Sequence, residues 1–208
     1  MGKSIIFIIE VEYDKKMNRT KNRPLPTNKI NLNLAFCIGL LFSFIGPFII
    51  WVQINLLTSL ICFFTIIIYV CIYTPLKRIS SINTLVGAIP GALPPLGGWV
   101  AATNEINIQG LMLFGVLFCW QIPHFLALAI IYKDDYSRGG FKMLPSITQD
   151  TNKISFQILF FTMALIYTSL GIFFLNLTSF IYALGAGILG LVFLFYSSAI
   201  LFDYSDLN

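Results

Sequence analysis

Six long apolar stretches alternate with short polar segments along this chain. Each stretch has about 20 residues, the length that an α-helix needs to cross the hydrocarbon core of a bilayer. A buried soluble core could hold one such helix but not six in succession. The pattern therefore predicts an all-α, polytopic membrane helical bundle with six transmembrane helices, at Leu34–Val52, Leu56–Thr74, Thr84–Ala102, Leu111–Ile131, Ile154–Phe174 and Ser179–Ile200.

The polar segments alternate in charge. All 13 lysine and arginine residues fall in the segments Lys3–Lys29, Lys77–Arg78 and Lys133–Lys153, and the intervening links contain none. Basic residues gather on the cytoplasmic side of membrane proteins, so both termini are expected to be cytoplasmic. We expect a single transmembrane domain over residues 1–208, with cytoplasmic motif segments at residues 1–31 and 132–153.

The composition agrees with a membrane protein. Hydrophobic residues make up 57% of the chain and charged residues only 11%, whereas a soluble domain has about 25% charged residues. All four cysteines lie within apolar stretches, without the spacing of a metal site or a disulfide framework, so we interpret them as packing residues. The expected surroundings are membrane lipid, and no nucleic-acid partner is expected.

Two acidic pairs stand beside basic residues in the cytoplasmic segments. Asp134 and Asp135 are adjacent and follow Lys133, at the end of an apolar stretch where carboxylates are costly. Glu10 and Asp14 are four residues apart, which places them on one face of a helix although like charges repel there. A hard divalent cation such as Mg²⁺, carrying substrate phosphates, would explain both pairs. Ordinary interfacial charges are the alternative explanation.

The basic residues near these acids allow two interpretations. Arginine and lysine bind phosphate oxygens, and such residues follow Asp14 and close the second span. They could equally fix the orientation of the chain or reach the lipid headgroups. If the three basic segments surround one cavity mouth, they form a two-site carboxylate clamp suited to a Mg²⁺–diphosphate group. The basic residues concerned are Arg19, Lys21, Arg23, Lys77 and Arg78.

Two spans carry unusual residues. The span Thr84–Ala102 contains three prolines and four glycines, which predicts either a broken helix that lines a cavity or a kinked helix. The span Leu111–Ile131 contains Gln121 and His124, which should face the bundle interior because polar groups are costly in lipid. They would make either an interhelical hydrogen bond or a substrate contact.

Five sequence motifs, in their order along the chain, resemble the motifs of one enzyme family. Asp14 with MNRTKNRPLP (Met17–Pro26), YTPLKR (Tyr73–Arg78), NTLVGAIPGALPPLGGW (Asn83–Trp99), WQIPHF (Trp120–Phe125) and DDYSRGGFKMLP (Asp134–Pro145) occur in this order. Together they resemble the UbiA-type intramembrane prenyltransferases, and in particular their haem-modifying branch, the protohaem IX farnesyltransferases.

The resemblance implies a reaction and a site. Farnesyl diphosphate would be the donor, haem b the acceptor and haem O the product, which a haem A synthase would use next. Mg²⁺ would bridge the diphosphate to the catalytic and metal-binding acids Glu10, Asp14, Asp134 and Asp135. The implied diphosphate-binding residues are Arg19, Arg23, Lys77, Arg78 and Lys133, and the implied haem or farnesyl pocket residues are Asn83, Trp120, Gln121, His124 and Tyr136.

Other expectations follow from the comparison with this family. Members have more spans than six, so the chain is expected to be incomplete, with two spans absent before Glu10 and one after Ile200. Ile6 stands where the family has an asparagine. The expected location is the bacterial plasma membrane rather than the mitochondrial inner membrane. The alternatives are prenyl transfer to a quinone-precursor ring, an inactive truncated copy, and a small membrane transporter.

Overall fold

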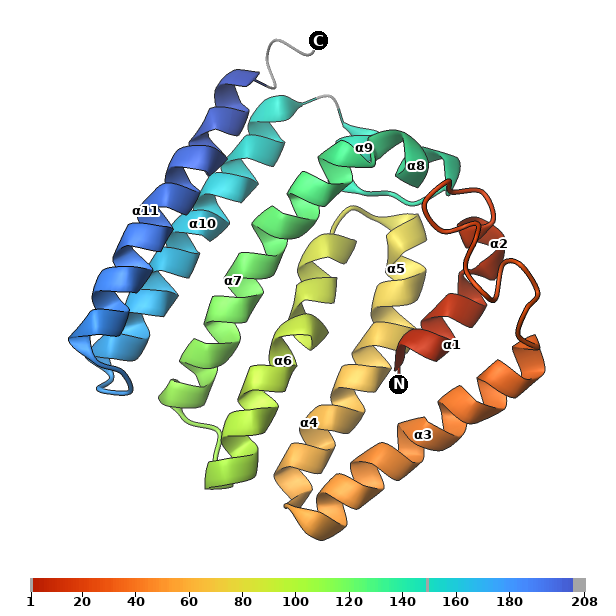
Figure 1. Cartoon of the computed structure of the whole chain (residues 1–208), viewed down its shortest axis with the longest axis horizontal. Coiled ribbons are helices and arrows are strands. Elements are labelled where there is room, and N and C mark those ends of the chain that lie inside the picture. The colour runs from red at the N-terminus through yellow and green to blue at the C-terminus, as the bar shows by residue number, and fades with distance from the viewer. Residues whose placement is uncertain (1, 149, 204–208) are drawn as a thin grey trace.

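The computed structural model describes residues 2–148 and 150–203, and every regular element in this part of the chain is helical. Residues 1, 149 and 204–208 of the expected 1–208 domain lie outside the described part. Figure 1 shows the helices, which are α1 (Gly2–Ile9), α2 (Val11–Asp14), α3 (Leu32–Gln53), α4 (Leu56–Ile67), the π-helix η1 (Ile68–Tyr73), α5 (Thr74–Ile79), α6 (Asn83–Thr103), α7 (Ile108–Ile131), α8 (Lys133–Arg138), α9 (Leu144–Ile147), α10 (Thr151–Phe174) and α11 (Phe180–Asp203).

Six helical segments of the described chain are long and apolar enough to cross a membrane, which confirms the predicted spans. They are α3, the continuous segment α4–η1–α5, α6, α7, α10 and α11. Polar residues cap the start of four of them: the side chains of Asn31, Asn55, Asn107 and Asp150 each accept a hydrogen bond from a backbone N–H in the first turn of the following helix. These caps satisfy donors that the helix itself leaves free.

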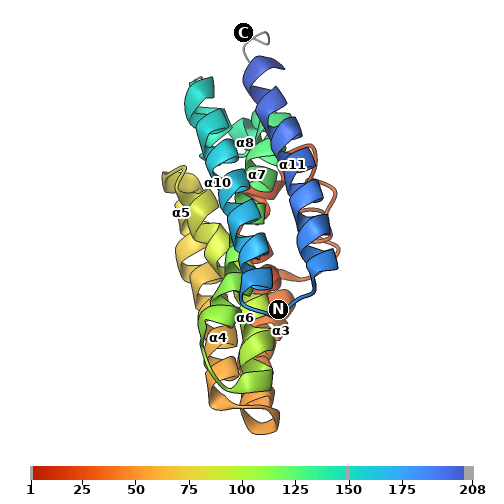
Figure 2. The same ribbon diagram turned by 90° about the vertical axis from the view of Figure 1, so that its left-hand side faces the viewer.

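The spans are arranged in chain order. Each packs on the next, from α3 through α4, α6, α7 and α10 to α11, and the row is visible from one side in Figure 1. The turned view shows α11 displaced to one side of α10 (Figure 2). A buried cluster of Ala88, Ile122, Leu126, Ile154 and Ile158 holds α6, α7 and α10 together. The helix α1 lies against α3 and η1.

The proline-rich span is not broken. The helix α6 is continuous through Pro90, Pro94 and Pro95, so the expectation of a broken helix is wrong. Gly91 instead allows close packing against α7, because a Cβ atom there would overlap the side-chain oxygen of Gln121. Small residues at such positions let membrane helices approach each other closely.

The second span contains a π-helical turn, η1, which ends two residues before Pro75. Proline has no backbone N–H, so it interrupts the regular hydrogen-bond ladder of the preceding turn. Both the backbone N–H and the hydroxyl of Thr74 donate to the carbonyl of Tyr69, and the hydroxyl bond is 2.8 Å long. Such turns often occur at functional sites. Here the turn determines the positions of Tyr69 and Tyr73.

Candidate active site

A cavity of about 360 Å³ opens at the end of the bundle where α2, α5 and α8 meet. Acidic and basic side chains come to it from separate parts of the sequence, while aromatic side chains form its inner wall. The structure thus brings all three basic segments to one cavity. The lining residues are Ile6, Glu10, Asp14, Met17, Arg19, Thr20, Arg23, Tyr69, Tyr73, Lys77, Phe125, Tyr136, Phe141 and Met143. We call this the charged cavity.

Two buried carboxylates in the charged cavity are each paired with a base. Asp14 is 1% exposed, and its Oδ2 atom accepts a hydrogen bond of 3.0 Å from Arg23. Glu10 is 4% exposed, and its Oε1 atom accepts a hydrogen bond of 2.9 Å from Lys77 Nζ. Buried charges are stable only when paired, so removing either partner would leave an uncompensated charge. The prediction that these acids and bases share one site is consistent with this geometry.

Aromatic residues of the π-helical turn position Lys77. The Lys77 ammonium lies 4.6 Å from the centre of the Tyr73 ring, which packs 5.7 Å from the ring of Tyr69. Gly87 makes room for Tyr73, because a Cβ atom there would lie 2.5 Å from the ring. Sequence reasoning missed both tyrosines. The proline within an apolar span was the available signal, because it predicts a local change in the helix.

Asp135 holds a loop rather than facing the charged cavity. Its two carboxylate oxygens accept hydrogen bonds from the backbone N–H groups of Asn18 (3.2 Å) and Arg19 (3.0 Å), and it also forms an ion pair with Arg138. The Arg138 guanidinium, followed by the Arg19 N–H, holds the pKa of Asp135 below its usual range. These contacts join α8 to a turn more than a hundred residues earlier. We call this arrangement the Asp135 clamp.

The Asp135 clamp brings Arg19 and Gly139 into contact with residues of the facing segment. The Arg19 guanidinium lies over the ring of Tyr132 and donates a hydrogen bond of 3.4 Å to the hydroxyl of Tyr136. A Cβ atom at Gly139 would lie 2.9 Å from Met17, so the two turns are in close contact. The clamp therefore positions Arg19 and Met17 at the rim of the charged cavity.

The clamp should respond to acid. Because the folded-state pKa of Asp135 is lowered, its contribution is complete above about pH 3.9, the ordinary aspartate value, and is lost as the pH falls through the lower folded value. We expect the amides of Asn18 and Arg19 to lose protection in that range. Hydrogen exchange followed by mass spectrometry measures the protection of these amides, once the rates are corrected for the intrinsic pH dependence of amide exchange. The Asp135→Asn chain should lack the acid step, and an identical step in both chains would contradict the assignment.

Besides Asp135 and the predicted residues of α7, four predicted site residues do not line the charged cavity. Lys133 and the exposed Asp134 have no hydrogen-bond or ion-pair partner among the described residues. Arg78 donates a hydrogen bond of 3.0 Å to the carbonyl of Ile9 and covers the ring of Tyr13, so it holds the end of α1. Asn83 is fully buried and donates to the carbonyls of Ser80 and Lys142, which joins α6 to the loop after α8.

The remaining predicted residues lie on α7, on two different faces. Gln121 is buried against α6 and donates a hydrogen bond of 3.0 Å to the carbonyl of Leu117. Trp120 and His124 are exposed and stack with a ring separation of 4.9 Å. Gln121 and His124 thus do not share a site, and the expectation of a buried position holds for Gln121 but not for the exposed His124. The next residue, Phe125, does reach the charged cavity.

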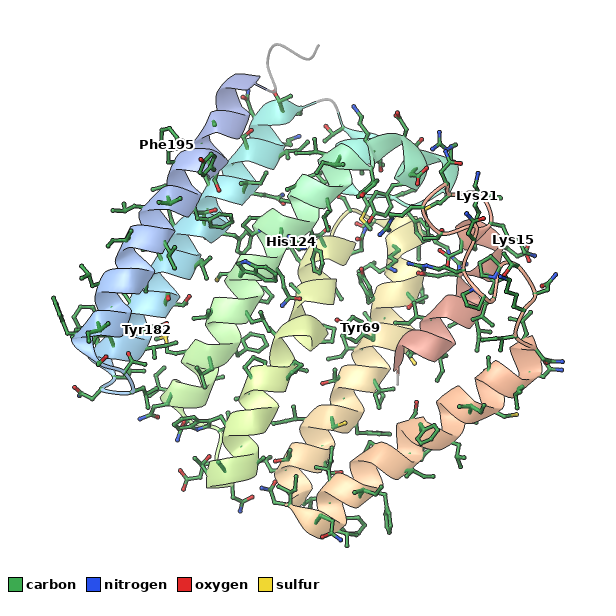
Figure 3. The ribbon with its side chains drawn as sticks, in the orientation of Figure 1. Lys15, Lys21, Tyr69, His124, Tyr182 and Phe195 are labelled. Atoms are coloured by element: carbon green, nitrogen blue, oxygen red, sulfur yellow. The ribbon has the colours of Figure 1, made fainter. Side chains whose placement is uncertain are left out.

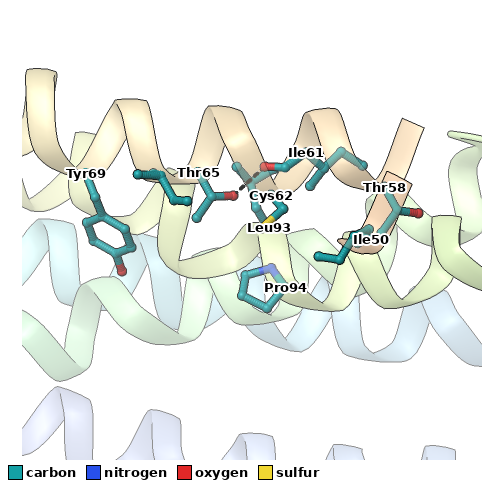
Figure 4. A pocket seen from close by; sticks show the side chains of 10 residues that line it. Ile50, Thr58, Ile61, Cys62, Thr65, Tyr69, Leu93 and Pro94 are labelled. Carbon is teal, nitrogen blue, oxygen red and sulfur yellow. Dashed lines mark hydrogen bonds between the residues drawn. The ribbon is translucent and has the colours of Figure 1, made fainter. Parts of the chain in front are cut away.

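An apolar cavity of about 480 Å³ lies beside the charged cavity, between α3, α4 and α6. Figure 4 shows its side chains, which include Ile61, Thr65, Leu93 and Pro94. The Thr65 hydroxyl donates to the carbonyl of Ile61 within its own helix, so it adds no free polar group. Tyr69 lines both cavities. The two spaces are therefore neighbours across one aromatic ring.

The sequence pattern of the UbiA prenyltransferase family matches residues 8–207, nearly the whole chain. The chain belongs to the UbiA prenyltransferase family. It is an integral, multi-pass membrane protein of that family. Among solved structures, the apo structure of a UbiA homologue from Aeropyrum pernix K1 is similar, with a TM-score of 0.76 and 18% identity over 98% of this chain and 76% of that one. This likeness agrees with the all-helical fold.

Several curated relatives of this UbiA-family chain carry the name protoheme IX farnesyltransferase. The relative from Solibacter usitatus is 41% identical over 186 residues, which cover 89% of this chain and 64% of the relative. The relative from Rickettsia massiliae is 40% identical over 94% of this chain and 64% of its own length. The relative from Flavobacterium psychrophilum is 42% identical over 78% of this chain and 54% of its own. The chain thus spans less than two thirds of the length of these relatives.

The carboxylate oxygens in the charged cavity are suitable ligands for a Mg²⁺ ion that is bound together with a phosphate group. Mg²⁺ commonly takes one or two carboxylates and completes its shell with substrate phosphates and water. Glu10 and Asp14 are two buried carboxylates on one cavity wall. Among residues 2–148 and 150–203, no three His, Cys, Asp or Glu side chains form a ready-made metal site. The two carboxylates therefore fit a Mg²⁺ ion whose other ligands are phosphate oxygens and water.

Proposed function

We propose that this protein transfers the farnesyl group of farnesyl diphosphate to a vinyl group of protohaem IX, which gives haem O. The observation that carries the proposal is the charged cavity, where two buried acids and three bases of one UbiA-family chain face a common space. The similarity to relatives named protoheme IX farnesyltransferase supports haem as the acceptor. The activity of those longer relatives is extended here to this chain.

The diphosphate group would bind in the charged cavity. Glu10 and Asp14 would hold Mg²⁺, which would neutralise charge on the diphosphate when bound. Lys77 and Arg23 now neutralise these two acids, and they would contact phosphate oxygens when the diphosphate enters. Arg19, at the rim, would add a third cationic contact. Fixed positive charge around a leaving diphosphate stabilises the transition state for its departure.

The bond changes of the proposed reaction are balanced. The C1–O bond of farnesyl diphosphate breaks, the electron pair leaves with the diphosphate, and an allylic cation remains. The terminal vinyl carbon of haem bonds to C1, and the adjacent carbon becomes cationic. Water adds there and loses a proton, which completes the hydroxyethylfarnesyl group. The rings of Tyr73 and Phe125 line the cavity and would stabilise the allylic cation through their faces.

The farnesyl chain would extend past Tyr69 into the apolar cavity between α3, α4 and α6. This cavity has the size of ordinary small-molecule sites, about 300–1,000 Å³, and its walls are mainly hydrocarbon. Placement there would keep the reactive C1 atom at the charged cavity while the tail is buried among apolar side chains. Burial of each added methylene contributes about 0.8 kcal/mol.

Filling the apolar cavity should shift the preference of the enzyme toward a prenyl donor with a shorter chain. Gly97 lines it, and a leucine at this position would occupy part of the space. We expect Gly97→Leu to raise the KM for farnesyl diphosphate about tenfold, with a smaller effect on the shorter geranyl diphosphate. The neighbouring Gly98 has open space around it and does not line the cavity, so Gly98→Leu is the control. Equal effects of both variants on both donors would contradict the placement.

The proposed setting is a bacterial plasma membrane, with the charged cavity on the cytoplasmic side where the three basic segments lie. The relatives named above are bacterial proteins. Haem O would then pass to an enzyme that oxidises it further, as a haem A synthase would do.

The proposal is tested by expressing the chain in a bacterium that lacks its own haem O synthase and measuring extracted haems by mass spectrometry. Haem O should appear with this chain and disappear with Asp14→Asn. A membrane-inserted chain that makes no haem O, but prenylates a hydroxybenzoate or naphthoate ring in membranes, would replace haem with a quinone precursor as the acceptor. A chain that binds no farnesyl diphosphate would contradict the transferase assignment altogether.

A further inference from the structure

A groove runs along α7, α10 and α11, separate from both cavities described above. It consists of two adjoining spaces of about 530 and 180 Å³ that share Trp120 and Phe193. The helix α10 packs against both α7 and α11 and so forms the floor of the groove. Its walls include Tyr196 of α11 and His124 of α7. The larger space is within the size range of small-molecule sites.

His124 is the only histidine of the sequence, and it projects from the second half of the membrane span α7 into this groove (Figure 3). Its ring stacks on Trp120 with an angle of 11° between the planes. Neither ring nitrogen has a hydrogen-bond partner among the described residues. An unpaired polar group at membrane depth is costly and is typical of a ligand-binding or ion-pathway position. The stacking holds the imidazole in one plane without using its nitrogens.

The groove adjoins the charged cavity. Phe125 lines that cavity and directly follows His124, and their rings are 5.8 Å apart. A molecule bound at His124 would thus have one edge close to the site proposed for the diphosphate. Transfer of a farnesyl group requires such an arrangement, because the acceptor carbon must reach C1 of the donor.

We propose that the groove binds the porphyrin acceptor, with a His124 ring nitrogen as the axial ligand of the haem iron. This inference rests on the proposed function and names its acceptor site. Imidazole is a common iron ligand. When it binds the haem iron axially, the porphyrin plane is perpendicular to the plane of the imidazole ring. Trp120 is therefore a positioning residue that sets the ring orientation, while Phe193 and Tyr196 supply aromatic walls. Gly185 leaves open space in the wall of the larger part.

Titration of purified chain in nanodiscs with haem b tests the ligand. The wild-type chain should bind haem saturably and show the absorption spectrum of histidine-ligated iron. The His124→Ala chain should lose that spectrum and bind haem about tenfold or more weakly. Free imidazole added to the His124→Ala chain should restore the spectrum, because it can occupy the vacated position. A merely structural role for His124 predicts no such rescue.

A second pair of variants tests the groove without touching the ligand. Gly185→Leu should weaken haem binding about tenfold by filling the larger space. Gly187→Leu is the matched control, because Gly187 also has open space around it but does not line the groove. Unchanged haem affinity and spectrum in both His124→Ala and Gly185→Leu would overturn the proposal.

Different results would contradict the assignment of the groove and the proposed function. If the two variants bind haem normally and the wild-type chain still makes haem O, the reaction stands and only the groove assignment is lost. If the wild-type chain binds farnesyl diphosphate but neither binds haem nor makes haem O, the proposed acceptor is wrong and the groove assignment falls with it. Farnesyl diphosphate binding is therefore measured on every variant.

Discussion

Replacing Asp14 by asparagine is expected to lower the rate of farnesyl transfer about 10²- to 10³-fold. Asp14 is buried, lines the charged cavity and pairs with Arg23. Asparagine has nearly the same shape but no charge, so it removes a metal ligand and leaves Arg23 beside a neutral group. The rate is measured as haem O formed per minute at saturating haem, over a series of Mg²⁺ concentrations.

Glu12→Gln is the matched control for this variant. Glu12 lies two residues away, its side chain is 75% exposed, and it pairs with Lys15 on the surface. Exposed pairs of this kind contribute less than about 1 kcal/mol, so the control should fold and react normally. If Asp14→Asn kept more than about a tenth of the wild-type rate, the charged cavity would not be the site of the reaction.

The second large effect is expected at Asp135. Asp135→Ala removes two backbone hydrogen bonds and an ion pair from the turn that carries Arg19. We expect the transfer rate at low donor concentration to fall about 10²-fold, mainly through weaker binding of farnesyl diphosphate. The rate at saturating donor should fall less, because the two buried acid–base pairs remain in place.

Asp134→Ala separates this explanation from direct metal binding. Both acids are metal ligands according to the family resemblance, but Asp134 is exposed and makes no described contact, whereas Asp135 forms the clamp. The clamp predicts a nearly normal Asp134→Ala enzyme, and an Asp135→Ala enzyme whose Mg²⁺ requirement is unchanged once donor is saturating. Similar losses in both variants, with a raised Mg²⁺ requirement, would favour two metal ligands.

The spans and their order followed from hydrophobicity alone, because a helix in lipid must be long, apolar and internally hydrogen-bonded. The pairing of each acid with its base did not. The sequence indicates that Glu10 and Lys77 lie on one side of the membrane, but 67 residues separate them, and the packing of α1 on η1 brings them together. Long-range pairings of this kind depend on the tertiary fold.

The two adjacent aspartates illustrate a different limit. Sequence gives Asp134 and Asp135 the same chemistry, while the first turn of α8 points one outward and the other toward the 17–20 turn. For Asp135 the outcome depends on the N–H groups within its reach, and no local pattern encodes that. The three prolines of α6 likewise suggested a break, yet α6 continues through all three.

Binding of farnesyl diphosphate to the purified chain, measured by calorimetry with and without Mg²⁺, is the most direct test that the charged cavity is a Mg²⁺–diphosphate site. We expect saturable binding that weakens about tenfold or more when Mg²⁺ is removed, which corresponds to about 1.4 kcal/mol. Asp14→Asn should bind as weakly with Mg²⁺ as the wild-type chain does without it, and Glu12→Gln should bind normally. Binding that is unaffected by both Mg²⁺ removal and Asp14→Asn would contradict the charged cavity as the donor site.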